Sequence, residues 1–272
     1  MKSKAAVLAK LHHAPPILVL PNAWDAASAR LFEDAGFPAI ATTSAGIAWS
    51  LGHADKQKLG RAEMADAVAR IARAVRIPVS ADVEAGYGDV AATVNAMIDA
   101  GAVGMNLEDA THHAGKPMFP VDEQKDRIRE ARRAAEARKI PLVINARTDL
   151  FLLAADPGAE PVYEAIELLN AYREAGADCL FAPGIADRLR IEALAKALRG
   201  PLNVLAGAGT PSVAELELMG VARLSIGSGA MRASMALTQR IAIELRGAGT
   251  YAQLTEHTLP YSDADDLMNR RD

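Results

Sequence analysis

Short runs rich in Val, Ile and Leu alternate along most of the chain with longer stretches rich in Ala, Glu and Arg. The short runs have the length and β-branched content of buried strands, and the long stretches space their apolar residues as amphipathic helices do. We expect strands at residues 17–21, 39–43, 77–82, 103–108, 142–147, 179–182, 202–206 and 223–226. We expect helices at residues 26–35, 61–74, 90–100, 122–138, 160–175, 187–198, 212–219 and 230–246. This succession of strand–helix units predicts parallel strands joined by crossover helices.

The links between helices and strands indicate how the sheet is arranged. Gly36, Gly101 and Gly176 each follow an alanine at a helix end, where a left-handed residue stops the helix before the next strand. Eight such units favour a closed (β/α)8 TIM barrel, and 272 residues are close to the roughly 250 typical of that fold. The alternative is an open doubly wound sheet, but no Gly-x-Gly-x-x-Gly follows the first strand, which disfavours dinucleotide binding.

We therefore predict a single barrel domain over residues 1–272. An N-terminal helix at 2–12 precedes the barrel. A C-terminal helical extension from about 249 to 272 follows it and is available for oligomer contacts.

Composition bounds the partners and the compartment. The formal net charge of −4 gives no general attraction to nucleic acid or to an anionic membrane. The N-terminal apolar stretch is too short for a signal peptide, and no run of about 18 apolar residues follows it. Cys179 is the one cysteine, so an internal disulfide is excluded and a reducing cytoplasm is the simplest compartment. We expect a small-molecule partner, without nucleic acid or membrane.

Polar side chains stand in pairs where three of the predicted strands end. The pairs are Asp82 and Glu84, Asn106 and Glu108, and Asn145 and Arg147. The members of a pair are two positions apart and so face one side of a strand, and a barrel places its active site at the carboxyl ends of its strands. We expect the three acids and the arginine to converge there. Acids offer only hard oxygen ligands, which suit Mg²⁺ or Mn²⁺ better than Zn²⁺. Helix capping or pairing with nearby Arg and Lys is the alternative.

Four ordered motifs carry a resemblance to a known superfamily. They are Thr43-Ser44-Ala45-Gly46-Ile47, Ala81-Asp82-Val83-Glu84-Ala85-Gly86-Tyr87-Gly88, Asn106-Leu107-Glu108-Asp109 and Asn145-Ala146-Arg147-Thr148-Asp149. With Pro21-Asn22-Ala23-Trp24-Asp25 before them, the chain up to about Arg232 resembles the isocitrate lyase/phosphoenolpyruvate mutase superfamily. It is most similar to the small mutase-like group, which includes phosphonomutase-like and oxaloacetate decarboxylase-like proteins.

The resemblance implies a metal site and a barrel. Asp82, Glu84 and Glu108 stand in the places of the acids that hold Mg²⁺ directly or through water. Glu84 is a departure, because the family commonly has aspartate there. Family members assemble as dimers or tetramers, often by exchanging a C-terminal helix, so a homodimer or homotetramer is expected.

The resemblance also implies substrate-binding and catalytic residues. Thr43, Ser44 and Ala45 match the segment that binds the substrate carboxylate through a hydroxyl and backbone amides, and Asp82 adjoins the substrate. Arg147 matches the strand-5 arginine expected to stabilise an enolate, with a structural pair to Asp149 as the alternative. An ungapped match places the gating-loop aspartate at Asp55, in a candidate lid over residues 46–59. Arg147, Asp55 and Thr43 are the expected catalytic residues.

The segment at residues 109–120 departs from the best-known members of the superfamily. It lacks the catalytic cysteine of isocitrate and methylisocitrate lyases, and Lys116 is displaced from the lysine of phosphonate-handling members. His112 and His113 are open to two interpretations, a general acid or base on a mobile loop or solvent-facing residues.

These features predict a Mg²⁺-dependent lyase or decarboxylase that acts on a small 2-oxo or 2-hydroxy dicarboxylic acid through an enolate. A phosphonomutase or phosphonopyruvate hydrolase that acts on a C–P bond is the alternative within the fold. A catalytically inactive barrel that binds a 2-oxo acid is the alternative from another class.

Overall fold

The computed structural model describes residues 1–13, 15–113, 115–153, 160–256 and 258–269. Its strands are β1 (Leu18–Leu20), β2 (Asn22–Ala23), β3 (Ile40–Thr42), β4 (Val79–Asp82), β5 (Gly104–Glu108), β6 (Ala110–His113), β7 (Lys116–Met118), β8 (Val143–Arg147), β9 (Cys179–Phe181), β10 (Leu202–Leu205) and β11 (Arg223–Ser225). Its helices are α1 (Lys2–Leu11), α2 (Ala26–Asp34), α3 (Ser44–Ser50), α4 (Arg61–Ala74), α5 (Val90–Ala100), α6 (Val121–Ala137), α7 (Leu150–Leu153), α8 (Glu160–Glu174), α9 (Arg188–Ala197), α10 (Val213–Leu218), α11 (Gly229–Gly247), α12 (Ala252–Thr255) and α13 (Tyr261–Asn269), with one 3₁₀ turn at Gly86–Gly88.

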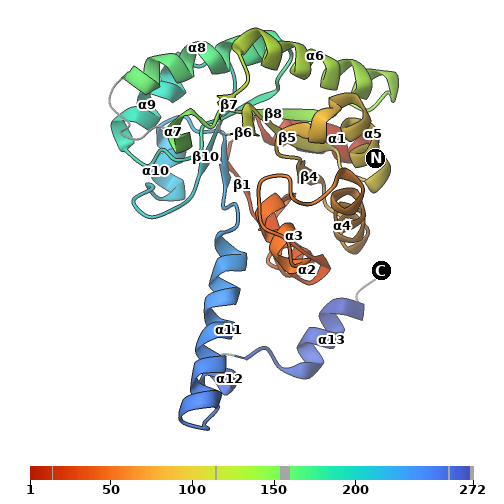
Figure 1. The fold of residues 1–272 in the computed structure, drawn as a ribbon, viewed down its shortest axis with the longest axis vertical. Helices are drawn as coiled ribbons and strands as arrows, with labels where there is room; N and C mark the ends of the chain where they lie inside the picture. Colours follow the sequence, from red (N-terminus) through yellow and green to blue (C-terminus); the bar gives the residue numbers. More distant parts are fainter. Residues whose placement is uncertain (14, 114, 154–159, 257, 270–272) are drawn as a thin grey trace.

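The parallel sheet closes on itself through its first strand. The strand order is β1-β11-β10-β9-β8-β5-β4-β3-β2, so β1 and β2 occupy the two ends of the order. These two segments are consecutive in the chain and are separated by Pro21 alone, which has no N–H to donate to a ladder. One interrupted strand therefore pairs with β11 on one side and β3 on the other. The result is the predicted TIM barrel, surrounded by helices (Figure 1).

The crossover helices form where the sequence signals place them. Asp89 caps the start of helix α5, because its carboxylate accepts the Ala92 N–H at 2.8 Å. Gly101 caps the end of the helix with φ of +100°. An added Cβ at Gly101 would lie 3.1 Å from the Ala72 side chain, in a backbone conformation that side chains rarely adopt. Helices α4 and α5 have the predicted bounds, and α1, α2, α6, α8, α9, α10 and α11 differ from prediction by one residue at one or both ends. The short helices α3 and α7 are not among the predicted elements.

Beneath the mouth, the barrel interior carries a layer of buried polar side chains. The Asn145 amide donates to Asn106 Oδ1 at 2.8 Å, and Arg223 Nη2 lies 3.3 Å from the same oxygen. The Ser225 hydroxyl donates to Asn203 Oδ1 at 3.2 Å. This layer fills the barrel below the strand ends, where a barrel places its active site.

The last barrel helix does not cover the barrel. Helix α11 runs away from the strands, and α13 returns to contact α2 (Figure 1). None of the 19 residues of α11 is buried against the described part of the chain. Among the described residues, no helix combines the length and the apolar character that crossing a membrane requires.

Candidate active site

A pocket of about 500 Å³ opens at the carboxyl ends of the barrel strands. Glu84, Glu108, His112, Arg147 and Asp55 are among its lining residues. A second, smaller pocket of about 160 Å³ adjoins it, since both pockets are lined by Ser44, Asp55, Arg147 and Leu152. The structure therefore brings most of the predicted site residues to one mouth.

Glu84 lies beyond the end of β4, in a turn. Its φ of +48° is rare for a residue with a side chain, so strand alternation does not continue from Asp82. Its carboxylate accepts the Gln57 N–H at 2.7 Å and the Tyr87 hydroxyl at 3.3 Å. Burial, together with the charges of Asp82 and Glu108, raises the pKa of Glu84 to about 7.

Glu108 and Arg147 face each other because strands β5 and β8 pair in register at these two residues. Arg147 Nη1 lies 2.8 Å from Glu108 Oε2, and Nη2 donates to Asp149 at 2.9 Å. Burial raises the pKa of Glu108 although Arg147 opposes the shift. Burial disfavours the guanidinium charge, but the carboxylates of Glu108 and Asp149 outweigh this and raise the pKa of Arg147. The predicted pairing with Asp149 is thus present together with the contact to the acidic cluster.

A buried carboxylate holds Asp149 in place from below. Asp109 is fully buried and accepts the Asp149 N–H at 2.9 Å and the Tyr172 hydroxyl at 2.8 Å. Burial raises the pKa of Asp109 to about 6. Because Asp149 in turn binds Arg147, this chain of contacts fixes the direction of the guanidinium.

Asp82 takes a different place from the other two predicted metal ligands. Its Oδ2 accepts both the N–H of Ser44, at 3.1 Å, and the Ser44 hydroxyl, at 2.7 Å. Its Oδ1 is buried and has no hydrogen-bond partner among the described residues. One carboxylate oxygen therefore holds the turn after β3, and the other is left without a partner among the described residues.

Thr43, Ser44 and Ala45 lie at the beginning of α3, which occupies the start of the segment predicted as a lid. The Thr43 hydroxyl caps this helix by accepting the Gly46 N–H at 3.3 Å. A Cβ at Gly46 would lie 2.6 Å from the Thr43 side chain, so the close approach requires glycine. Asp82 binds the Ser44 amide, and the Ala45 amide has no such bond within the part of the chain that the structure describes. Ala45 lines the smaller pocket.

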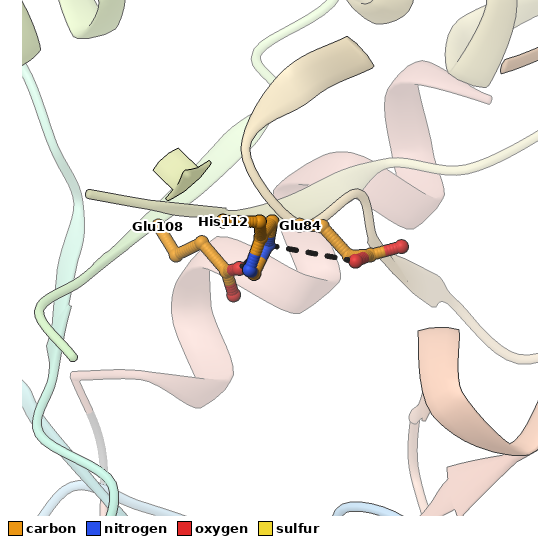
Figure 2. Close-up of side chains that lie close together, drawn as sticks. All are labelled: Glu84, Glu108 and His112. Carbon is orange, nitrogen blue, oxygen red and sulfur yellow. Dashed lines mark ion pairs between the residues drawn. The ribbon is translucent and has the colours of Figure 1, made fainter. Parts of the chain in front are cut away.

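The segment after Glu108 forms a hairpin of β6 and β7 instead of the predicted loop. His112 lies in it with φ of +59°, next to an irregularity in strand register, and points at the two glutamates (Figure 2). Its Nε2 is 2.8 Å from Glu108 Oε1 and 3.7 Å from Glu84 Oε2. The contact with Glu108 raises the pKa of His112. Glu84, Glu108 and His112 each offer one ligand atom within 4.8 Å of the others, so they could hold a metal ion.

These neighbours can be predicted only in part from the sequence. His112 was open to two interpretations, and its position four residues after Glu108 is the signal that associates it with the acids. Tyr87 lies inside one of the four motifs, whereas nothing in the sequence distinguishes Gln57. Lys116 Nζ lies 2.8 Å from Glu123 and does not line the 500 Å³ pocket. Residue 114 of the same segment lies outside the described residues.

Fold and site together define a TIM-barrel enzyme with an acidic pocket and one arginine at the carboxyl ends of its strands. The family model for phosphoenolpyruvate phosphomutase matches residues 8–246. The chain therefore belongs to the phosphoenolpyruvate phosphomutase family, and the resemblance to the isocitrate lyase/phosphoenolpyruvate mutase superfamily is confirmed.

Three relatives illustrate the similarity. A solved structure of a protein from Burkholderia cenocepacia J2315 has a TM-score of 0.93 and 39% identity, and the match covers 100% of this chain and 97% of that one. A 2-methylisocitrate lyase from Bacillus subtilis is 32% identical over 202 residues, 71% of this chain and 64% of that enzyme. An oxaloacetate decarboxylase from Rhodopseudomonas palustris is 32% identical over 191 residues, 66% of this chain and 63% of that enzyme.

Proposed function

We propose that the chain is a divalent-metal-dependent carbon–carbon lyase or decarboxylase that cleaves a small 2-oxo or 2-hydroxy dicarboxylic acid through an enolate. By their names, two of the relatives above are a carbon–carbon lyase and a decarboxylase. The observation that carries the proposal is the convergence of Glu84, Glu108 and Arg147 on one pocket of about 500 Å³. Oxaloacetate-like compounds are the first substrates to test.

The pocket offers separate groups for the two ends of a 2-oxo acid. Ala45 lines the smaller pocket, and its amide, which has no hydrogen bond among the described residues, is available to a carboxylate oxygen. Arg147 keeps 18% of its side-chain surface exposed, so its guanidinium can also meet an oxygen anion at the mouth. Negative charge that develops on the keto oxygen as the neighbouring bond breaks is stabilised by such a fixed cation. Asp55, from the segment after α3, lines both pockets, and we assign to it the exchange of a proton with the substrate.

The residues present fit a small divalent cation. Two buried glutamates with raised pKa values and the unpartnered Oδ1 of Asp82 form an acidic cluster at this mouth, which a cation would neutralise. A bound cation supplies Lewis-acid polarisation of the keto oxygen. Glu84 and Glu108 would hold it, and Asp82 would do so directly or through water, with Mg²⁺ or Mn²⁺ as the expected ions.

Cleavage of a C–P bond is the second candidate, favoured by the family model that the chain matches. A phosphonate carries more negative charge than a carboxylate and needs more cationic partners. The lining of the 500 Å³ pocket includes four acids, Asp55, Glu84, Glu108 and Asp149, against the two cations Lys56 and Arg147. Arg147 is already bonded to two of these acids. This balance of charge favours the C–C reaction.

A substrate panel tests both candidates. Purified protein with Mg²⁺ or Mn²⁺ is incubated with 2-oxo, 2-hydroxy and phosphono acids, and products are followed by ¹³C and ³¹P NMR. We expect pyruvate or another 2-oxo acid from a dicarboxylate, without inorganic phosphate or a phosphate ester from phosphonopyruvate. Phosphorus products would establish the second candidate. Binding of a 2-oxo acid without turnover of any compound would establish an inactive barrel and refute the lyase.

We also infer that the chain assembles with copies of itself, as a homodimer or homotetramer, through its C-terminal helices. Helix α11 contributes no buried residue, and Ile243 and Tyr261 are 65% and 88% exposed. Several exposed apolar residues on the same group of helices are typical of a surface that binds another protein. Ile243→Glu should lower the mass measured by light scattering, and an unchanged monomeric mass in both proteins would contradict the inference.

The cytoplasmic compartment remains a prediction from the single cysteine.

A further inference from the structure

We propose that His112 supplies a nitrogen ligand to the divalent cation at Glu84 and Glu108, and that this shifts the preference of the site from Mg²⁺ toward first-row transition ions such as Mn²⁺ and Co²⁺. The proposal rests on the proposed function, because the cation site belongs to it.

The distances among the three side chains suit one shared ion. Ligand atoms about 2.1 Å from a small divalent ion lie about 3.0 Å apart at adjacent positions and about 4.2 Å apart at opposite positions. The two measured separations from His112 Nε2 are 2.8 and 3.7 Å, and all three ligand atoms lie within 4.8 Å of one another. Small side-chain rotations therefore bring all three onto one ion.

The His112 nitrogen is close to Glu108 without forming a directed hydrogen bond to it. Nε2 is buried and has no hydrogen-bond partner in the described part of the chain, although Glu108 Oε1 is 2.8 Å away. A second buried atom at the same mouth, Asp82 Oδ1, is also without a partner there, and Asp82 is only 7% exposed. Of the two atoms, His112 Nε2 is in ion-pair contact with Glu108, whereas Asp82 Oδ1 has no partner among the described residues. A buried polar atom without a partner needs an explanation, and a cation at this mouth provides one.

The backbone holds the imidazole in this position. His112 follows β5 by four residues, and the irregular register of the β6–β7 hairpin turns its side chain toward the barrel. Irregularities of this kind re-aim side chains next to active sites. His113, the next residue, is exposed and does not belong to the group of three.

A nitrogen ligand changes which ion binds best. Mg²⁺ favours an all-oxygen octahedral shell and keeps several waters, whereas imidazole suits first-row transition ions. The three acids alone would favour Mg²⁺, so the expected selectivity depends on the one histidine.

The experiment measures metal binding in the full-length protein without substrate. Calorimetry gives the affinities for Mg²⁺, Mn²⁺ and Co²⁺, and pulsed EPR of the Mn²⁺-loaded protein detects nitrogen nuclei bound to the ion. The variant is His112→Gly, because glycine adopts the φ of +59° without strain. His113→Ala is the matched control, and Glu108→Gln tests the site itself.

We expect a histidine nitrogen signal in the wild type and in His113→Ala but not in His112→Gly. In His112→Gly the affinities for Mn²⁺ and Co²⁺ should fall about tenfold or more, with less than about a threefold change for Mg²⁺. Should His112→Gly fail to fold, ¹⁵N-histidine labelling of the wild type and of His113→Ala must change the nitrogen signal in both.

Two results would overturn the inference about His112, and only the second would also overturn the metal site of the proposed function. In the first result, Glu108→Gln loses Mn²⁺ binding, but the Mn²⁺-loaded wild type shows no histidine nitrogen signal, or His112→Gly keeps the wild-type ratio of Mn²⁺ to Mg²⁺ affinity. His112 is then not a ligand, and the proposed function stands. If the wild type binds no divalent ion, or Glu108→Gln binds it equally well, the metal site of the proposed function fails as well.

Discussion

Replacing Arg147 by methionine should damage both the stability of the fold and turnover. Arg147 binds Glu108 at 2.8 Å and Asp149 at 2.9 Å, and these carboxylates keep only 3% and 8% of their side-chain surface exposed. Removing one partner of a buried ion pair costs about 3–5 kcal/mol, because an uncompensated charge remains. For a chain of this size about 3 kcal/mol lowers Tm by about 6–12 °C.

The loss of turnover should exceed what the loss of stability explains. A fixed donor to a developing oxyanion contributes about a 100- to 1000-fold rate increase, so kcat should fall by about that factor well below Tm. Arg147→Lys keeps the charge but loses the planar fork, so it should recover part of the stability and little of the turnover.

A remote arginine provides the matched control. Arg132 binds Asp178 and the carbonyl oxygens of Leu142 and Gly176, and it does not line the active-site pocket. Arg132→Met should therefore lower Tm while kcat at low temperature stays within about twofold of the wild type. Urea unfolding and steady-state kinetics at 15 °C would measure both quantities. A destabilisation of Arg147→Met below about 1 kcal/mol, or a kcat equal to that of Arg132→Met, would refute the reasoning.

Three further perturbations have defined outcomes. Burial lowers the pKa of His12 to about 3, so below pH 6.5 the unfolded chain takes up a proton at this histidine and the folded chain does not. The free energy of unfolding should therefore be about 2 kcal/mol lower at pH 5 than above pH 6.5. The urea midpoint of His12→Leu should lack this part of the pH dependence. Ser44→Ala removes a hydrogen bond to the buried carboxylate of Asp82 and should cost about 1.5–3 kcal/mol in urea unfolding. Arg127 donates to the Ala85 carbonyl beside Glu84, so Arg127→Met should weaken Mn²⁺ binding by about tenfold in calorimetry.

Each of these predictions has a nearby control. The difference in the free energy of unfolding between the wild type and His12→Leu should be the same at pH 7.5 and 8.5, because His12 gains no proton there in the folded or the unfolded chain. A difference that changes between these two pH values would contradict the role given to His12. Ser50→Ala, on the same short helix, removes a partly buried hydrogen bond from the exposed Ser50 to the Ile47 carbonyl and should cost less than about 0.5 kcal/mol. Arg129→Met, two residues from Arg127 and paired with exposed Asp126, should leave Mn²⁺ affinity unchanged.

Most of the barrel could be predicted because each strand and helix carries its own local signal. The pattern at residues 90–100 predicts α5 because its apolar residues have helical spacing and Gly101 follows its last alanine. The short helix α3 and the β6–β7 hairpin could not be predicted, because both are held by contacts with distant residues. Asp82, for example, accepts the Ser44 amide from a different strand end.

The candidate site divides in the same way. Glu108 and Arg147 lie inside strands, so their two-residue spacing from Asn106 and Asn145 predicts a common face, and the register of β5 and β8 pairs them. Glu84 lies beyond its strand at a φ of +48°, which separates it from Asp82 in a way that alternation does not predict.

The central claim is that the site stabilises the enolate of a metal-bound 2-oxo acid with the help of Arg147. Oxalate is a planar dianion that resembles the enolate of pyruvate, and a site complementary to such an intermediate binds its analogue tightly. Calorimetry of oxalate binding, with malonate as the non-planar control, measures this without knowledge of the substrate. We expect oxalate binding that requires a divalent ion, that exceeds malonate binding by about 100-fold, and that is lost in Arg147→Met. Oxalate binding of equal strength after EDTA treatment, or equal affinities for the two acids, would contradict it.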